Sequence, residues 1–297
     1  MSELRRGEVI ATYGRNSRVE SEGRTWYCVL RGRRGEIACG DQVDWRETSS
    51  GEGVIEQVLP RRNLLYRSDA YRRKLLAANV DQVLIVVAVE PSFSTDLVSR
   101  ALVAAESAEI PLTALLNKVE LAALASARER LAPFVALGVS VVETSLKIEP
   151  ADAIAKLLPV LAGKTTVVIG QSGMGKSTLV NLLVPDAAAD TREVSVKLDS
   201  GKHTTTSARI YRGDGFRLVD SPGFQEFGLA HLDLLELQNA FVEFRPLLGG
   251  CKFYNCRHHD EPGCAIVAAV ARGEIAQDRY ALYRQLASER ATEVRPH

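Results

Sequence analysis

The sequence has no hydrophobic run long enough to cross a bilayer and no excess of charge of either sign. Uninterrupted apolar stretches such as Val83 to Val89 are no longer than 8 residues, whereas a membrane-spanning helix needs about 20 apolar residues. The opening residues, MSELRRGEVI, lack the apolar core of a signal peptide. Lys plus Arg and Asp plus Glu each number 37, so the net charge is zero and no global field attracts the whole chain to nucleic acid. We therefore expect a cytoplasmic protein.

Cysteine is scarce, and its distribution argues against a disulfide framework. The 5 cysteines cannot all pair, and the last three fall between residues 251 and 264 beside histidines. Such clustering is typical of metal binding in a reducing compartment. Cys28 and Cys39 stand apart, in strand-like surroundings where they serve as small apolar residues.

The C-terminal cluster has the spacing C-x4-C-x-H-x5-C and offers four soft or borderline metal ligands. A full set of protein ligands leaves no open position, which is the pattern of structural zinc. Because the ligands are close in sequence, the ion would pin a loop that has little core of its own. The alternative is a set of free thiols. The predicted ligands are Cys251, Cys256, His258 and Cys264, although chemistry alone does not separate His258 from the adjacent His259.

Basic residues gather towards the N-terminus. Residues 1–75 carry 15 Lys plus Arg against 11 Asp plus Glu, a net charge of +4, which leaves −4 for the remainder. Between Gly7 and Arg67, short alternating runs separated by Gly, Ser and Asn predict a small β-barrel. An Arg-rich barrel is a candidate RNA-binding module, although the same arginines are compatible with solvated loops.

From Asp81 onward the pattern changes to buried strands that alternate with helices. Continuous apolar runs such as VLIVVAVE and PLTALL predict a parallel sheet covered on both faces. After Gly223 the chain becomes helical and polar. With 297 residues, 46% of them hydrophobic, the chain has room for two or three domains. Helices are expected up to Ala104, over 122–137, up to Leu161, and over 231–244, 265–271 and 277–289.

The run GQSGMGKST, residues 170–178, matches G-x-x-x-x-G-K-[ST] between a strand-like TTVVIG and a helix-like STLVNLLV. In that context the pattern predicts a phosphate-binding loop rather than a simple glycine-rich turn. Its glycines let successive backbone N–H groups face a β-phosphate. Lys176 adds a charge near the β- and γ-oxygens, and the Ser177 hydroxyl is placed to ligate Mg²⁺.

Three further segments carry candidate nucleotide-binding residues. LVDSPG begins within the strand-like FRLV. Its Asp220 would lie close to a bound magnesium ion, and the Gly223 N–H would be available to a γ-phosphate. LLNKVE follows PLTALL, and its Asn117 and Lys118 resemble the guanine-reading N-K-x-D signature. ETSLK, residues 143–147, resembles the backbone segment that contacts the guanine carbonyl.

These segments stand in an unusual order, because the base-reading elements precede the phosphate loop instead of following D-x-x-G. With GKHTTT before DSPG and CKFYNCRHHDEPGC near the C-terminus, the chain resembles the RsgA (also YjeQ) family of ribosome small-subunit-dependent, circularly permuted GTPases over nearly its whole length. The resemblance implies an OB-fold barrel, a permuted GTPase domain and a zinc-binding domain in which His258 is the histidine ligand. It also implies the small ribosomal subunit and its rRNA as partners, and a role in late subunit maturation.

The segment between the phosphate-loop helix and DSPG has little periodicity and is the natural switch loop. A threonine there would complete magnesium coordination, and Thr204 and Thr205 are the candidates. Phe224 stands where Ras-like GTPases carry a water-orienting Gln, and phenylalanine neither donates nor accepts a hydrogen bond. Slow intrinsic hydrolysis is therefore expected. The resemblance implies that His203, in the family's G-x-H-T-T motif, takes the missing role.

Two positions depart from the usual patterns. Glu120 stands where guanine-reading motifs carry Asp, so the acceptors are kept but shifted by one methylene. Gly173 stands where potassium-activated GTPases carry Asn, which argues against activation by potassium.

We therefore predict a multidomain α/β protein with an OB-fold RNA-binding domain over 1–68, a circularly permuted GTPase domain over 69–228 and a zinc-binding helical domain over 229–297. It is expected to be a monomeric GTP hydrolase that uses Mg²⁺, held by Ser177 and Thr205, with His203 as the catalytic residue. Two alternatives stay open: a P-loop ATPase or small-molecule kinase, and an RNA-binding scaffold that holds GTP with negligible turnover. The predicted GTP-binding residues are Asn117, Lys118, Val119, Glu120, Ser145, Leu146, Gly170, Gln171, Ser172, Gly173, Met174, Gly175, Lys176, Ser177, Thr178, Thr204, Thr205, Asp220 and Gly223.

Overall fold

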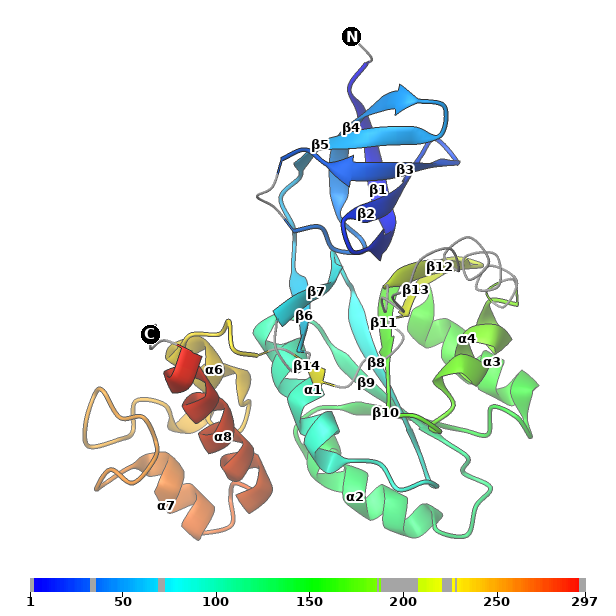
Figure 1. Ribbon diagram of the computed structural model, residues 1–297. Helices are drawn as coiled ribbons and strands as arrows, with labels where there is room; N and C mark the ends of the chain where they lie inside the picture. The colour runs from blue at the N-terminus through cyan, green and yellow to red at the C-terminus, as the bar shows by residue number, and fades with distance from the viewer. Residues whose placement is uncertain are drawn as a thin grey trace.

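A small barrel, a central sheet flanked by helices and a separate helical unit follow one another along the chain (Figure 1). The computed structural model describes residues 3–32, 36–68, 73–185, 187, 208–220, 226–227 and 229–293. Within that part of the chain, no helix combines the length and apolarity needed to cross a membrane.

The N-terminal barrel closes on itself, as the alternating pattern predicts. Its strands pair in the order β1-β2-β3-β5-β4, and β4 returns to β1. The β3–β5 pair is parallel and the others are antiparallel, an arrangement that matches the partly open five-stranded OB-fold. Trp26 and Trp45 pack at 4.6 Å between ring centroids inside it. The strands are β1 (Arg5–Tyr13), β2 (Asn16–Ser21), β3 (Arg24–Leu30), β4 (Gln42–Ser49) and β5 (Glu52–Val58).

A small second sheet lies between the barrel and the rest of the molecule. It has the order β14-β6-β7, all antiparallel. The predicted boundary between residues 68 and 69 falls between β6 and β7, and it stays a prediction. The strands are β6 (Leu64–Ser68), β7 (Arg73–Ala78) and β14 (Glu226–Phe227).

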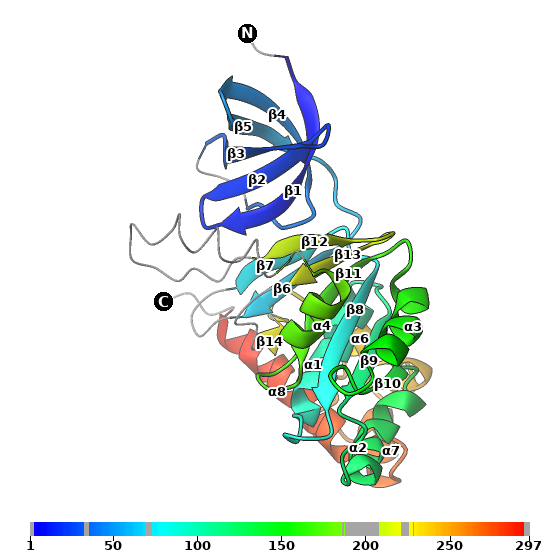
Figure 2. The same cartoon turned by 90° about the vertical axis from the view of Figure 1, so that its right-hand side faces the viewer.

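The central sheet has the order β10-β9-β8-β11-β13-β12. Its first five strands are parallel, as predicted from their continuous apolar sequences, and β12 is antiparallel. β12 also pairs with barrel strand β1, Ala11 opposite Arg209, so the two sheets are hydrogen-bonded into one. Figure 2 shows the barrel standing against this edge. The strands are β8 (Gln82–Ala88), β9 (Leu112–Asn117), β10 (Ser140–Thr144), β11 (Thr165–Ile169), β12 (Arg209–Gly213) and β13 (Phe216–Asp220).

Helices cover both faces of this sheet. α1 and α2 lie on one side and α3 and α4 on the other (Figure 1). Because all the parallel strands end at the same edge, the segments after β9, β10, β11 and β13 meet there, which is where open α/β sheets bind ligands. The helices are α1 (Thr95–Ser107), α2 (Leu124–Ala136), α3 (Pro150–Leu161) and α4 (Lys176–Leu183).

The C-terminal unit is helical, as predicted, but its first helix is shorter than residues 231–244. Asp233 and Glu236 form a capping box that starts α6, and the backbone leaves the helix at Phe241. This exit lets Phe241 and Phe244 stack at 5.1 Å and pack edge-on against Tyr283 in the core. Burial of three aromatic rings thus outweighs continuation of the helix. The elements are α6 (Leu234–Ala240), the 3₁₀ turn η1 (Arg245–Leu247), α7 (Ala265–Ala271) and α8 (Gln277–Glu293).

Candidate nucleotide site and metal centre

The phosphate loop runs from the end of β11 to the start of α4. Its last glycine, Gly175, precedes α4 with a φ of +106°, a left-handed value that favours glycine. A Cβ on Gly175 would lie 2.3 Å from Nδ2 of Asn117, and one on Gly170 would lie 2.5 Å from the carbonyl oxygen of Val86. Glycine is therefore required at both places for close packing. The loop leads directly into the N-terminus of α4, whose free backbone N–H groups can bind an anion.

Asn117, at the end of β9, forms hydrogen bonds to both the phosphate loop and the segment after β10. Its Nδ2 donates to the carbonyl of Met174 at 2.9 Å, and its Oδ1 accepts from the N–H of Leu146 at 3.1 Å. The side chain is buried, so these bonds are shielded from water. One amide thus joins three segments that the sequence places far apart: the phosphate loop, the end of β9 and the turn after β10.

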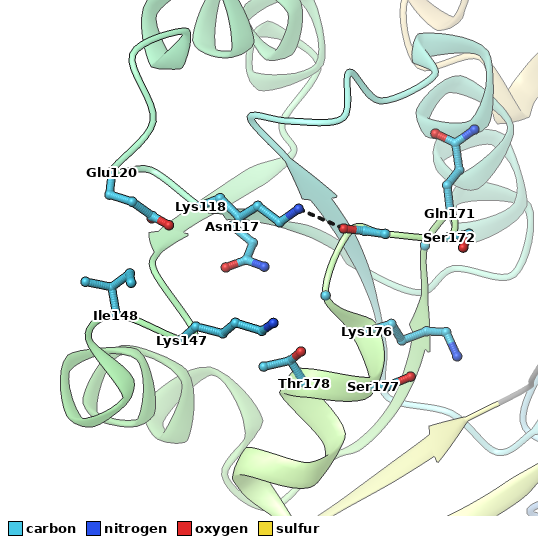
Figure 3. Close-up of a pocket in the computed structure, with 13 residues that line it drawn as sticks. Asn117, Lys118, Glu120, Lys147, Ile148, Gln171, Ser172, Lys176, Ser177 and Thr178 are labelled. Atoms are coloured by element: carbon cyan, nitrogen blue, oxygen red, sulfur yellow. Dashed lines mark hydrogen bonds between the residues drawn. The ribbon is translucent and has the colours of Figure 1, made fainter.

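Lys118 makes a second connection from the same strand end. Its Nζ donates to the carbonyl oxygen of Gly173 at 3.0 Å (Figure 3) and to that of Glu90 at 2.6 Å. Its backbone has a φ of +63°, an uncommon left-handed value for a lysine. The Lys118 stem therefore extends over the phosphate loop and holds its middle against the loop after β8.

Glu120 reaches the segment after β10. The Ser145 hydroxyl, which is buried, donates to the Glu120 carboxylate. In Figure 3 the Glu120 carboxylate lies at the end of the pocket opposite Lys176 and Ser177. The longer side chain therefore keeps its acceptors near the base-reading segments. Val119 completes this corner, because its N–H donates to the carbonyl of Thr144 at 3.4 Å.

The segments enclose a cavity of about 930 Å³. Lys147 and Ile148 contribute to the wall although they were not among the predicted residues, and Ile148 exposes 66% of its surface. Lys147 could have been predicted because it belongs to the ETSLK segment, whereas nothing in the sequence indicates that Ile148 lines a cavity. Met174 is buried beneath the loop instead of lining the cavity. The lining residues are Asn117, Lys118, Glu120, Lys147, Ile148, Gly170, Gln171, Ser172, Gly173, Gly175, Lys176, Ser177 and Thr178.

The phosphate end of the cavity carries a close ion pair. Lys176 Nζ lies 2.5 Å from Asp220 Oδ1, because β11 and β13 are neighbours, Asp220 is the last residue of β13 and Lys176 opens α4 after the loop that follows β11. A bound γ-phosphate would compete with Asp220 for Lys176, and Mg²⁺ would compete with Lys176 for Asp220. The predicted residues His203, Thr204, Thr205 and Gly223, and also Phe224, lie outside the described residues.

A contact that sequence reasoning missed joins the phosphate loop to α1. The Gln171 Oε1 accepts from the backbone N–H of Ser94 at 2.8 Å. Ser94 is the N-cap of α1, and its hydroxyl accepts from the N–H of Leu97 at 3.2 Å. A serine ahead of an apolar helix is a visible capping signal, but its partner in the phosphate loop is distant in sequence and carries no signal of its own.

The four predicted metal ligands come together in the C-terminal unit. Their ligand atoms all lie within 4.8 Å of one another. His258 Nδ1 is 3.5 Å from the Cys251 sulfur and 3.4 Å from the Cys264 sulfur, and those sulfurs are 3.9 Å apart. Tetrahedral zinc with its usual bond lengths requires separations of about 3.5 Å for N···S and about 3.8 Å for S···S. The donor set therefore fits one structural zinc ion held by Cys251, Cys256, His258 and Cys264.

Backbone and tyrosine contacts hold these ligands in place. Burial raises the pKa of the Cys256 thiol to about 12, so a cation is needed to keep it as a thiolate at neutral pH. The Tyr280 hydroxyl donates to the carbonyl oxygens of His258, at 2.8 Å, and His259, at 2.7 Å. Burial alone would raise the pKa of Glu261, but the backbone N–H groups of Arg257 and His259 outweigh it and lower the pKa to about 2.

Comparisons with known proteins agree with this architecture. The model of the RsgA GTPase family matches residues 58–230. The small ribosomal subunit biogenesis GTPase RsgA of Burkholderia pseudomallei (strain K96243) is 56% identical over 99% of this chain and 95% of that protein. The crystal structure of YjeQ from Thermotoga maritima has a TM-score of 0.70 at 34% identity, covering 99% of this chain and 100% of that one. YloQ, described as a circularly permuted GTPase, has a TM-score of 0.68 at 28% identity, covering 99% and 98%. The chain therefore belongs to the RsgA GTPase family.

Proposed function

We propose that this protein hydrolyses GTP while bound to the small ribosomal subunit and acts in the late maturation of that subunit. The relatives that span nearly the whole chain are named small ribosomal subunit biogenesis GTPases. The observation that carries the proposal is the contact of one buried amide, Asn117, with both Met174 and Leu146. A site in which base-reading and phosphate-binding segments share a residue is built for a whole nucleotide.

The two ends of the cavity take different parts of that nucleotide. Guanine would lie between Asn117, Glu120 and the backbone of Ser145 and Leu146, where the carboxylate can accept from the ring N–H and the exocyclic amine. The phosphates would lie over the loop from Gly170 to Thr178, where backbone N–H groups and Lys176 offset their charge. Ser177 and Thr205 would hold Mg²⁺, which supplies charge neutralisation at the β- and γ-oxygens.

The chemical step is attack of water on the γ-phosphorus, which breaks the bond to the β-phosphate oxygen and yields GDP and phosphate. We assign orientation of this water to His203, because Phe224 has no hydrogen-bonding group at the position of the usual glutamine. On the subunit, His203 would be positioned to act on the water beside the γ-phosphate. Slow turnover by the free protein follows from the same assignment.

The two flanking units would supply the ribosome contacts. Residues 1–75, which contain the barrel, carry the positive charge excess, and the zinc-bound unit lies on the other side of the GTPase sheet from α3 and α4 (Figure 1). We propose that both bind rRNA, that the free protein is a monomer and that it acts in the cytoplasm.

Steady-state GTP hydrolysis with and without purified small subunits tests the proposal. Subunits should raise the rate with GTP, large subunits should not, and ATP should be a poor substrate. Equal turnover of ATP and GTP would support the ATPase or kinase alternative instead. Tight GTP binding with no turnover under either condition would support the scaffold alternative.

A further inference from the structure

The zinc-bound loop exposes two neighbouring aromatic side chains that make no part of the nucleotide site. Phe253 is 42% exposed and Tyr254 is fully exposed. Among the described residues, Tyr254 is the most exposed of the large hydrophobic side chains. Figure 1 shows the loop between η1 and α7 projecting from the C-terminal unit on the side away from the central sheet. A fully exposed ring leaves both of its faces available to a partner.

The loop that carries these rings is held at both ends. The zinc ligands Cys251 and Cys256 flank it directly. The Lys252 N–H donates to the carbonyl of Gly263 at 3.0 Å, and the Cys256 N–H donates to the carbonyl of Phe253 at 3.2 Å. Metal ligation and these two bonds fix the backbone, so a partner that binds the rings would not first have to order the loop.

Positive charge accompanies the rings. Lys252 Nζ lies 5.6 Å from the centroid of the Phe253 ring. Lys252 and Arg257 are both exposed, and neither forms an ion pair with another residue in the described part of the chain. The two carboxylates that come next in the sequence, those of Asp260 and Glu261, interact with other groups. Asp260 lies 3.7 Å from Arg284, and Glu261 accepts the backbone N–H groups of Arg257 and His259.

We propose that Phe253 and Tyr254 stack on unpaired RNA bases, with Lys252 and Arg257 on the adjacent phosphates. Every base has a flat π-face that an aromatic ring can cover, and cations beside the ring match the backbone charge. Bases inside a duplex are already stacked, so the loop selects single-stranded segments and looped-out bases. A protein partner would instead favour rings surrounded by few charges. The inference rests on the proposed function, which supplies rRNA as the RNA.

The test uses full-length, zinc-loaded protein and fluorescence anisotropy with two probes, a short oligoadenylate and an RNA duplex of equal length. Tyr254→Ala should weaken oligoadenylate binding about tenfold, because one base loses the ring on which it stacks. Tyr254→Trp should retain the affinity, whereas Tyr254→Leu should lose it as alanine does. Duplex binding should change little. Val135→Ala, which trims another exposed apolar side chain, in α2, is the matched control and should bind as wild type does.

Zinc content and basal GTP hydrolysis should be unchanged in every variant, which separates loss of stacking from loss of fold. Unchanged oligoadenylate affinity in Tyr254→Ala, or full affinity in Tyr254→Leu, would overturn the inference. Weaker binding to small subunits without weaker binding to RNA would also overturn it, in favour of a protein contact. These outcomes leave subunit-stimulated GTP hydrolysis by the wild type intact. The absence of that stimulation would contradict the proposed function independently of Tyr254.

Discussion

The buried guanidinium of Arg279, in α8, forms a two-point ion pair with the carboxylate of Glu243. It also donates a hydrogen bond to α1. Its Nε and Nη2 lie 2.7 and 3.1 Å from the two carboxylate oxygens, and its Nη1 donates to the carbonyl of Ser99 at 3.1 Å. The two side chains are only 4% and 8% exposed. Since Ser94, the N-cap of α1, contacts Gln171 of the phosphate loop, one helix links the nucleotide site to the zinc-bound unit.

Removing the negative partner of this pair should destabilise the protein strongly. Glu243→Gln leaves the Arg279 charge buried and uncompensated, a change that costs about 3–5 kcal/mol in comparable sites. Urea denaturation followed by circular dichroism measures the free energy of unfolding. Glu274→Gln is the matched control because it breaks the exposed Arg272–Glu274 pair, and it should have no measurable effect. Equal effects of the two substitutions would show that burial of the pair is unimportant.

Gly175→Ala should impair nucleotide binding more than folding. The new methyl would strain a φ of +106° and would meet the Asn117 amide that holds the loop. We expect GDP affinity to fall by about tenfold or more, because the loop has to move away from Asn117 and its N–H groups then no longer face the phosphates. Titration with a fluorescent GDP analogue measures the change. Gly163→Ala also strains a positive φ, but nothing lies near its Cβ, so it should keep the affinity. A similar loss in both variants would contradict this reading.

The sequence predicts the elements of this protein better than their connections. Buried parallel strands, the alternating barrel and the phosphate loop have local periodicities or fixed spacings, and each is found where predicted. The pairing of β1 with β12, the Gln171–Ser94 contact and the Arg279–Glu243 pair involve residues far apart in sequence. Tertiary packing decides such contacts, and no local pattern encodes them.

The zinc ligands and the nucleotide residues illustrate the same division. Four metal ligands within one short segment can be predicted because the ion itself requires them to be close. Ile148 lines the nucleotide cavity only because the turn after β10 passes there. An apolar side chain such as isoleucine does not by itself indicate a binding site in a sequence. The early end of α6 is likewise set by packing of Phe241 and Phe244 against Tyr283, which a helical period cannot show.

Glu120 should lower guanine affinity without abolishing selectivity. We expect the wild type to prefer GTP over ATP by about tenfold or more, because a site built for guanine leaves polar groups unpaired with adenine. Glu120→Asp should tighten GTP binding by placing the carboxylate at the usual distance. Competition against a labelled guanine nucleotide measures both. Ser145→Ala, which removes only the hydroxyl that Glu120 accepts from, separates positioning of the carboxylate from its length. Equal ATP and GTP affinities would contradict the guanine assignment.

Loss of one zinc ligand should release the metal and loosen the C-terminal unit. Cys256→Ser should reduce zinc from one ion per chain towards none and lower the midpoint of thermal unfolding, since metal binding contributes folding energy. GDP affinity should fall only modestly, because the nucleotide cavity lies in the other unit. Atomic emission measures the metal. Cys28→Ser alters a cysteine in the barrel and should keep full zinc occupancy. Protein purified without chelator that contains no zinc would contradict the assignment.

His203→Ala should separate catalysis from binding. If His203 orients the attacking water on the ribosome, its removal should lower subunit-stimulated turnover by about 10²- to 10⁴-fold, the range of general acid–base contributions. GTP affinity and subunit binding should stay near wild type. Lys176→Ala and Ser177→Ala should instead weaken nucleotide or magnesium binding, because those residues lie in the cavity itself. Single-turnover hydrolysis with saturating subunits, together with equilibrium binding, distinguishes the two classes. A His203→Ala protein that keeps most of the stimulated rate would mean that rRNA or a switch threonine orients the water.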